Sequence, residues 1–310
     1  MSSGRNLKDY AYLGLTGMTM GAADVVPGVS GGTMAFIMGV YQELIDAIKS
    51  FDVELARKAL KFDVKGILDQ VPWKFLAALG SGIALSIMTL AHAVTYFMDN
   101  HQNYLYAFFF GLILASIVAM GLGMKWSGNT VMGLIAGTLL AYWIVGLVPS
   151  TAENTPLILF FSGCIAISAM ILPGISGSFI LLILGQYAYV IEAIKNFDVV
   201  TLLPLALGCG LGLMAFARIL SWLFHHYERI TITLLIGFML GSLRKIWPFK
   251  ETLETRIDRH GEEVPLIQIN VLPEPSAELW ICLGLAVFGF VLILGLNRLR
   301  PRHDEATSEA

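Results

Sequence analysis

Charged residues are scarce in this 310-residue sequence, since Asp, Glu, Lys and Arg make up only 14% of it, against roughly a quarter in ordinary soluble domains. The net charge of −3 shows no basic excess of the kind that binds nucleic acid. The three cysteines, Cys164, Cys209 and Cys282, form neither a disulfide framework nor a metal-ligand spacing. No Walker-type phosphate loop occurs, and no pattern indicates a cofactor or a metal. These absences argue against a soluble enzyme, a nucleic-acid-binding protein and an ATP-driven pump.

Apolar residues, by contrast, make up 56% of the chain, and the mean hydropathy is +0.72. A spanning helix needs about 20 apolar residues. Ten apolar segments approach this length: 8–24, 28–48, 74–98, 104–124, 129–148, 156–171, 175–194, 199–224, 230–246 and 279–297. The sequence therefore predicts an all-α polytopic membrane protein. Segments 8–24 and 156–171 are short and run into Pro-Gly, so each can start a re-entrant hairpin or a full crossing.

Basic residues predict the orientation, because cytoplasmic loops carry more Lys and Arg than outer loops. With the N-terminus inside, the inner loops collect a clear majority of the 20 basic residues. They are Arg5, Lys8, Lys49, Arg57, Lys58, Lys61, Lys65, Lys74, Lys125, Arg229, Arg298, Arg300 and Arg302. Both termini are thus expected to be cytoplasmic.

An internal repeat is the strongest signal in the sequence. Residues 27–52 align without a gap to residues 173–198, and half of the aligned positions are identical, where chance would give about two matches. We therefore expect two membrane repeats of about five segments each, 1–150 and 151–310. The first contains a charged insertion, 53–72, expected to be a surface-lying helix, and the second an outer loop, 244–278. Because five is odd, the second repeat starts on the opposite face, as in the inverted repeats of secondary transporters.

Each repeat contains a Pro-Gly-x-Ser-Gly turn, and the chemistry of these turns favours an anion. Glycine lets the backbone approach a ligand, hydroxyls donate hydrogen bonds, and the helices that follow present free N–H groups, so phosphate is the preferred ligand. Both broken helices are expected to meet near the membrane midplane. The alternative is that small residues serve only tight packing or a re-entrant bend. The phosphate-binding candidates in the turns are Gly28, Ser30, Gly31, Gly32, Thr33, Gly174, Ser176, Gly177 and Ser178.

Three charged residues add to this hypothesis. Arg218 lies deep in an apolar segment, where a charge is costly, and can clamp a phosphate or simply extend to the interface. Asp24 and Glu43 break the repeat symmetry, since Met170 and Tyr189 stand at the corresponding positions. Both are candidates for carrying a coupling ion, H⁺ or Na⁺, although Asp24 can instead cap the following helix.

An enzyme remains an alternative, because Ser30 and Ser176 each lie in the Gly-x-Ser-Gly pattern of rhomboid intramembrane proteases. A nucleophilic serine needs a base within hydrogen-bond reach. Only His92, His225 and His226 come from apolar segments, and they are not related by the repeat. The duplicated serine therefore favours transport over proteolysis.

The run Gly21-Ala-Ala-Asp24-Val-Val-Pro27-Gly-Val-Ser30-Gly-Gly-Thr33, with the second run Pro173-Gly-Ile-Ser176-Gly-Ser178, resembles the bacterial undecaprenyl-phosphate translocase family of the PopT type. The resemblance covers nearly the whole chain. It implies a flippase in the bacterial cytoplasmic membrane that returns undecaprenyl phosphate from the outer to the inner leaflet for peptidoglycan synthesis. The partners it implies are this lipid and the surrounding membrane lipids.

Gradient-driven lipid transport is accordingly the expected function. Inward movement of a phosphate opposes an inside-negative potential, which predicts coupling to H⁺ or Na⁺. The rivals are a channel or exchanger for a small inorganic anion, a phospholipid scramblase and the protease described above. The sequence leaves both a monomer and a homodimer open.

Overall fold

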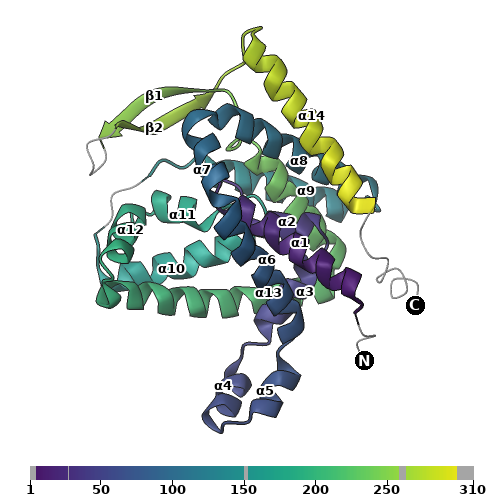
Figure 1. Ribbon diagram of the computed structural model, residues 1–310, viewed down its shortest axis with the longest axis vertical. Helices are drawn as coiled ribbons and strands as arrows, with labels where there is room; N and C mark the ends of the chain where they lie inside the picture. The colour runs from purple at the N-terminus through teal and green to yellow at the C-terminus, as the bar shows by residue number, and fades with distance from the viewer. Residues whose placement is uncertain (1–4, 27, 150–152, 258–262, 299–310) are drawn as a thin grey trace.

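The computed structural model describes residues 5–26, 28–149, 153–257 and 263–298, which form fourteen helices and one two-stranded sheet (Figure 1). The first half contains α1 (Leu7–Asp24), α2 (Gly31–Ile37), α3 (Tyr41–Lys49), α4 (Val53–Leu60), α5 (Val64–Gln70), α6 (Trp73–Thr89), α7 (Ala91–Asn100), α8 (Gln102–Leu122) and α9 (Gly128–Val145). The second half contains α10 (Pro156–Ile171), α11 (Gly177–Ile183), α12 (Tyr187–Lys195), α13 (Val199–Ser242), β1 (Lys250–Ile257), β2 (Glu263–Asn270) and α14 (Ala277–Arg298).

The two copies of the sequence repeat fold alike. In each copy a serine caps a seven-residue helix: Ser30 caps α2 and Ser176 caps α11. A glycine with positive φ ends each of these helices, Gly39 at 73° and Gly185 at 72°. The chain then turns sharply into a nine-residue helix, and the axes of α11 and α12 differ by 115°. The predicted segments 28–48 and 175–194 are therefore bent helix pairs, because the glycine conformation ends the first helix and redirects the chain.

Close helix pairs build the body: α1 with α6, α10 with α13, α8 with α14, and α9 with α13. Small residues allow backbones to approach closely, which is how helices associate in lipid. In each pair a glycine lies where an added Cβ would clash with a backbone carbonyl of the partner: Gly17 with Leu79, Gly163 with Leu205, Gly111 with Ala286, and Gly237 with Leu134. Two of these pairs join a helix of the first 150 residues to a helix of the rest, so the halves interlock.

Two elements differ from the sequence expectation. The insertion 53–72 is a hairpin of two short helices, α4 and α5, because Asp52 and Asp63 each cap a new helix. The hairpin projects from the bottom of the body in Figure 1 and has no buried residue. The outer loop 244–278 contains an antiparallel β-hairpin, β1–β2, whose alternating β-branched residues suit strands. The predicted segments 199–224 and 230–246 correspond to the two parts of α13, which meet at a kink where Tyr227 has a non-helical backbone.

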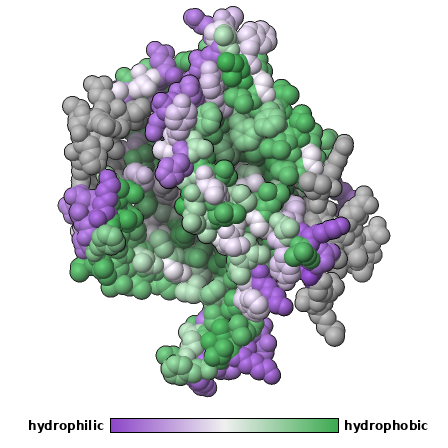
Figure 2. Space-filling view, in the orientation of Figure 1, coloured by the Kyte–Doolittle hydropathy of each residue, from purple (hydrophilic) through white to green (hydrophobic). Residues whose placement is uncertain are grey.

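The outer surface is strongly apolar, and large hydrophobic side chains are exposed along α6, α9, α13 and α14. Figure 2 shows the corresponding broad hydrophobic areas on one face of the molecule. Among the described residues, four helices are long and apolar enough to cross a membrane, or up to six spans if each bent pair counts as one. Exposed apolar surface of this extent suits lipid rather than water. The chain is a multi-pass, mostly helical membrane protein.

Candidate functional site

The two Pro-Gly turns lie against each other. The first turn connects α1 to α2, and the second connects α10 to α11. The Ser30 hydroxyl donates to the Met170 carbonyl at 2.9 Å, and the Gly174 N–H donates to Thr33 Oγ1 at 2.8 Å. The Tyr41 hydroxyl adds a third link to the Ile171 carbonyl at 2.9 Å. Residues 130 to 141 positions apart are thus joined directly by hydrogen bonds.

The first turn is occupied by its own side chains. Asp24, at the end of α1, accepts from the Gly31 N–H at 2.6 Å, and Ser30 Oγ accepts from the Gly32 N–H at 3.1 Å. Ser30 and Thr33 are fully buried. A carboxylate therefore already lies at the start of α2, the place where the sequence predicts an anion. Pro27 lies outside the described residues.

The second turn is organised differently, because Met170 replaces the carboxylate. Ser176 Oγ accepts from the Phe179 N–H at 3.3 Å and lies 3.3 Å from Ser178 Oγ. Ser176 is nearly buried, whereas Ser178 is exposed. Gly174, like Gly28, has a positive φ of about 90°. Of the candidate hydroxyls in the two turns, the Ser178 hydroxyl is the one that reaches the surface.

Lys245 lies beside both turns. A Cβ at Gly28 would be 3.0 Å from Cγ of Lys245, and the Lys245 ammonium lies 4.2 Å from the centre of the Phe179 ring in α11. The second turn packs on the same end of α13, since a Cβ at Gly174 would clash with the Ser242 hydroxyl. Lys245 is not among the site residues expected from the sequence, and it lies within the expected outer loop 244–278. Its position at the end of the apolar segment 230–246 was the signal that could have identified it.

Two further cations accompany Lys245. Lys250 Nζ donates to the Lys245 carbonyl at 2.6 Å and lies 4.7 Å from the centre of the Tyr106 ring. Arg244 lies over the ring of Tyr142. Burial, and then the charge of Lys245, lowers the pKa of Lys250 to about 7.

The other predicted charges lie elsewhere. Arg218, on α13, donates to the Met214 carbonyl at 2.9 Å, and its charge helps to lower the pKa of Asp52, after the hydrogen bonds from Leu55 and Gln70. Glu43, on α3, forms an ion pair with Arg5. The structure brings Asp24 to the turns. Arg218 and Glu43 contact other partners.

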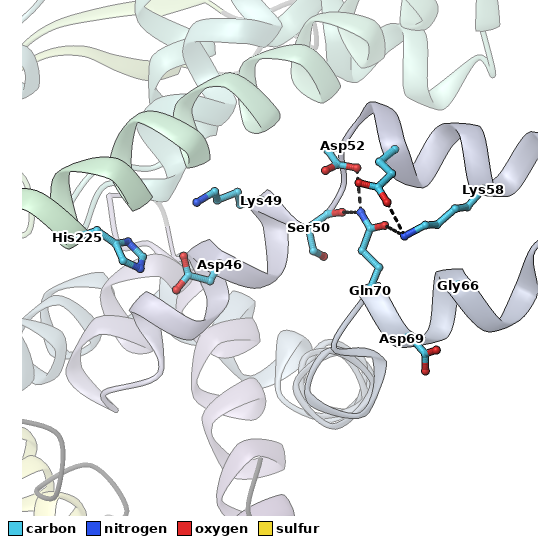
Figure 3. A pocket seen from close by; sticks show the side chains of 10 residues that line it. Asp46, Lys49, Ser50, Asp52, Lys58, Gly66, Asp69, Gln70 and His225 are labelled. Carbon is cyan, nitrogen blue, oxygen red and sulfur yellow. Dashed lines mark hydrogen bonds and ion pairs between the residues drawn. The ribbon is translucent and has the colours of Figure 1, made fainter. Parts of the chain in front are cut away.

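A polar cavity of about 780 Å³ separates the α4–α5 hairpin from α3 and α13 (Figure 3). Gln70 closes one side by donating to the Ser50 carbonyl and Asp52, and by accepting from Lys58. The cavity lining also includes Asp46, Lys49, Glu54, Asp69 and His225. Its charges are mixed and carboxylates outnumber lysines, so it is a poor receptor for a phosphate.

An apolar groove of about 520 Å³ runs between α10 and α13. It is lined by Cys164, Ile165, Ser168, Ala169, Leu172, Leu211, Gly212, Ala215, Phe216 and Ile219. Leu172 directly precedes Pro173-Gly174, so the groove ends at the second turn. The volume of this apolar groove is within the range of about 300–1,000 Å³ that is typical of small-ligand sites.

The protease alternative finds no catalytic pair in the described part of the chain. Ser30 and Ser176 hydrogen-bond to backbone groups and to Ser178. His225 bonds to the Ser221 carbonyl and His226 to the Trp222 carbonyl. Within the described ranges, no three metal-binding side chains cluster in a way that could hold a metal ion.

Comparisons with known proteins agree with the resemblance seen in the sequence. A family model described as undecaprenyl phosphate translocase-like matches residues 20–264. A polyprenyl-phosphate transporter of Vibrio cholerae serotype O1 is 44% identical over 299 residues, which cover 94% of this chain and 97% of the relative. A polyprenyl-phosphate transporter of Staphylococcus aureus is 32% identical over 316 residues, with the same coverage. No solved structure matches the chain. The chain belongs to the undecaprenyl phosphate translocase-like family.

Proposed function

We propose that this protein transports a polyprenyl phosphate, undecaprenyl phosphate above all, from the outer to the inner leaflet of the bacterial cytoplasmic membrane. Two relatives covering most of the chain carry the name polyprenyl-phosphate transporter. The observation that carries the proposal is the direct hydrogen bonding of the two turns inside an apolar helical body. The paired turns form one polar region inside this apolar body. A lipid headgroup can bind there while its isoprenoid tail remains in the membrane.

The headgroup site consists of the two turns. The exposed Ser178 hydroxyl and the backbone N–H groups of Ser176 and Gly177 offer donors on the second turn. Gly174 shapes this turn, and its own N–H bonds to Thr33. Gly28, Ser30, Gly31, Gly32 and Thr33 shape the first turn and hold it against the second. Arg218, on α13, is the cation among the phosphate-binding residues. It binds the phosphate on the cytoplasmic side of the membrane. The groove between α10 and α13 receives the part of the isoprenoid chain next to the headgroup, because it is apolar and ends at Leu172.

The two halves form an inverted repeat, with both termini cytoplasmic and the turns near the midplane. Support comes from the matching glycine contacts of the helix pairs, since Gly17 and Gly163 pack on Leu79 and Leu205. Rocking of one half against the other around a fixed site is the usual motion of such transporters.

Transport inward requires an energy source. A phosphate with one or two negative charges moves against an inside-negative potential at a cost of roughly 2–5 kcal/mol at 100 mV. Coupling to inward H⁺ or Na⁺ offsets this cost. Asp24 is better placed than Glu43 to carry the ion, because its carboxylate contacts the first turn.

The test is the leaflet accessibility of undecaprenyl phosphate in proteoliposomes. The wild-type protein should change it, and the double variant Ser30→Ala/Ser176→Ala should slow the change, while Ser81→Ala, an exposed serine on α6, should not. A chloride current without lipid movement would favour the inorganic anion channel. Equal movement of ordinary phospholipids would favour the scramblase.

A further inference from the structure

The charge on Lys245 has no carboxylate partner among the described residues. The described part of the chain contains two ion pairs, Arg5 with Glu43 and Lys58 with Glu54, and neither includes Lys245. Its ammonium instead faces the Phe179 ring at 4.2 Å. A cation over an aromatic face is moderately stabilised but keeps its capacity to bind an anion.

The surroundings of Lys245 increase the positive charge rather than neutralise it. Lys250 bonds to the Lys245 carbonyl at 2.6 Å, and Arg244 is the adjacent residue. A half-buried cluster of like charges is unfavourable in a protein unless an anion joins it. Lys245 packs on the first turn, and the proposed function places the phosphate of the lipid at the two turns.

We propose that Lys245 binds the phosphate monoester head of the substrate at the paired turns, with Lys250 and Arg244 raising the local positive potential. This inference rests on the proposed function and adds to it a specificity-determining residue. Lys245 contacts Gly28 of the first turn and Phe179 beyond the second, so a phosphate bound there touches both repeats. An ammonium supplies three donors and a full charge, which suits a phosphate better than neutral hydroxyls. Lys250 acts as a positioning residue through the Lys245 carbonyl.

The experiment measures binding to the purified full-length protein with three probes: undecaprenyl phosphate, undecaprenol and inorganic phosphate. The variants are Lys245→Gln, Lys245→Arg and the matched control Lys195→Gln, which removes an exposed lysine of α12. Melting curves confirm that each variant is folded. Lys245→Gln should weaken binding of undecaprenyl phosphate roughly ten- to hundredfold and leave undecaprenol unchanged. Lys245→Arg should retain most of the affinity, and Lys195→Gln all of it.

Each outcome decides a separate question. Wild-type affinity for undecaprenyl phosphate in the Lys245→Gln protein would overturn the inference while leaving the proposed function intact. Equal affinity of the wild-type protein for undecaprenyl phosphate and undecaprenol would overturn the proposed function, since the headgroup would not be recognised. Binding of inorganic phosphate that depends on Lys245, without binding of the lipid, would keep the anion site and replace the lipid substrate by a free anion.

Discussion

The Thr33 side chain stabilises the contact between the two turns. It is fully buried, and its hydroxyl accepts from the Gly174 N–H of the other turn at 2.8 Å. Without this acceptor the Gly174 N–H would remain buried and unsatisfied, which costs about 1–3 kcal/mol. We expect Thr33→Val to lower the free energy of unfolding by that amount, as measured by denaturant unfolding in detergent.

The control for this prediction is Thr89→Val on α6. Thr89 is exposed, and its hydroxyl bonds only to the Leu85 carbonyl of its own helix. This change should alter stability by less than about 0.5 kcal/mol. Equal effects of the two substitutions would show that the link between the turns contributes nothing.

Lys250 should make headgroup binding dependent on pH. Its pKa is about 7, and the groups that face it are Lys245 and Tyr106. Between about pH 7 and pH 8.5 Lys250 loses its proton while a phosphate monoester, with a second pKa near 6, stays a dianion. Affinity for undecaprenyl phosphate should therefore fall about three- to tenfold over this range, measured by titration at constant ionic strength.

Lys250→Arg provides the check, because arginine stays charged and should flatten the profile. Stability moves in the opposite direction. The unfolded chain holds the Lys250 proton up to about pH 10, so it binds more protons than the folded chain between about pH 7 and pH 10, and stability rises across that window. A flat binding profile in the wild-type protein would contradict the prediction.

The sequence was sufficient to locate the turns but not to assign their atoms. The repeat shows that Ser30 and Ser176 occupy equivalent positions, and the structure places both turns together. Which hydroxyl is free depends on packing between distant segments, and this is why Ser30 is buried while Ser178 is exposed. The sequence marks Lys245 as a charge at the end of an apolar segment, but its contact with Gly28 depends on packing between distant segments in the same way.

At the level of elements, hydropathy predicted the long helices well. It could not predict where helices break, because Gly39 and Gly185 stop α2 and α11 through backbone conformation rather than polarity. The α4–α5 hairpin was expected as one surface helix, and the cap formed by Asp63 divides it. The β-hairpin in the outer loop was not predicted, because the apolar segments identify only helices.

The groove between α10 and α13 gives the element-scale prediction. Ala215 lines it, and Ala215→Phe should fill part of the space that the isoprenoid chain occupies. Transport of undecaprenyl phosphate should slow several-fold, while a short-chain phosphate such as farnesyl phosphate should be affected less. Both are measured as leaflet accessibility in proteoliposomes.

Ala206→Phe is the matched control, since Ala206 is also an exposed alanine of α13 but does not line the groove. Equal slowing by both substitutions would mean that bulk on α13, not occupation of the groove, limits transport.

On the scale of the whole molecule, the halves are interlocked rather than side by side. α8 of the first half packs on α14, and α9 packs on α13. The repeat in the sequence indicates equivalence of the halves but not this exchange of partners, which depends on glycine contacts such as Gly111 with Ala286. The rocking proposed above would therefore take place around these tight interfaces, with the turns as the shared centre.

The membrane potential acts on the net charge that the whole protein moves, at about 2.3 kcal/mol per charge for 100 mV. Asp24 contacts the first turn through the Gly31 N–H, so a proton or Na⁺ bound there would travel with the phosphate. In wild-type proteoliposomes, inward movement of undecaprenyl phosphate should accelerate when an inward H⁺ or Na⁺ gradient is imposed. Asp24→Asn should remove this acceleration but keep the gradient-independent exchange, because asparagine keeps an oxygen acceptor for Gly31.

Glu43→Gln should retain the acceleration, since Glu43 pairs with Arg5. Loss of the gradient effect in Glu43→Gln alone would assign the coupling ion to Glu43, and an identical gradient response in all three proteins would show that neither carboxylate carries it.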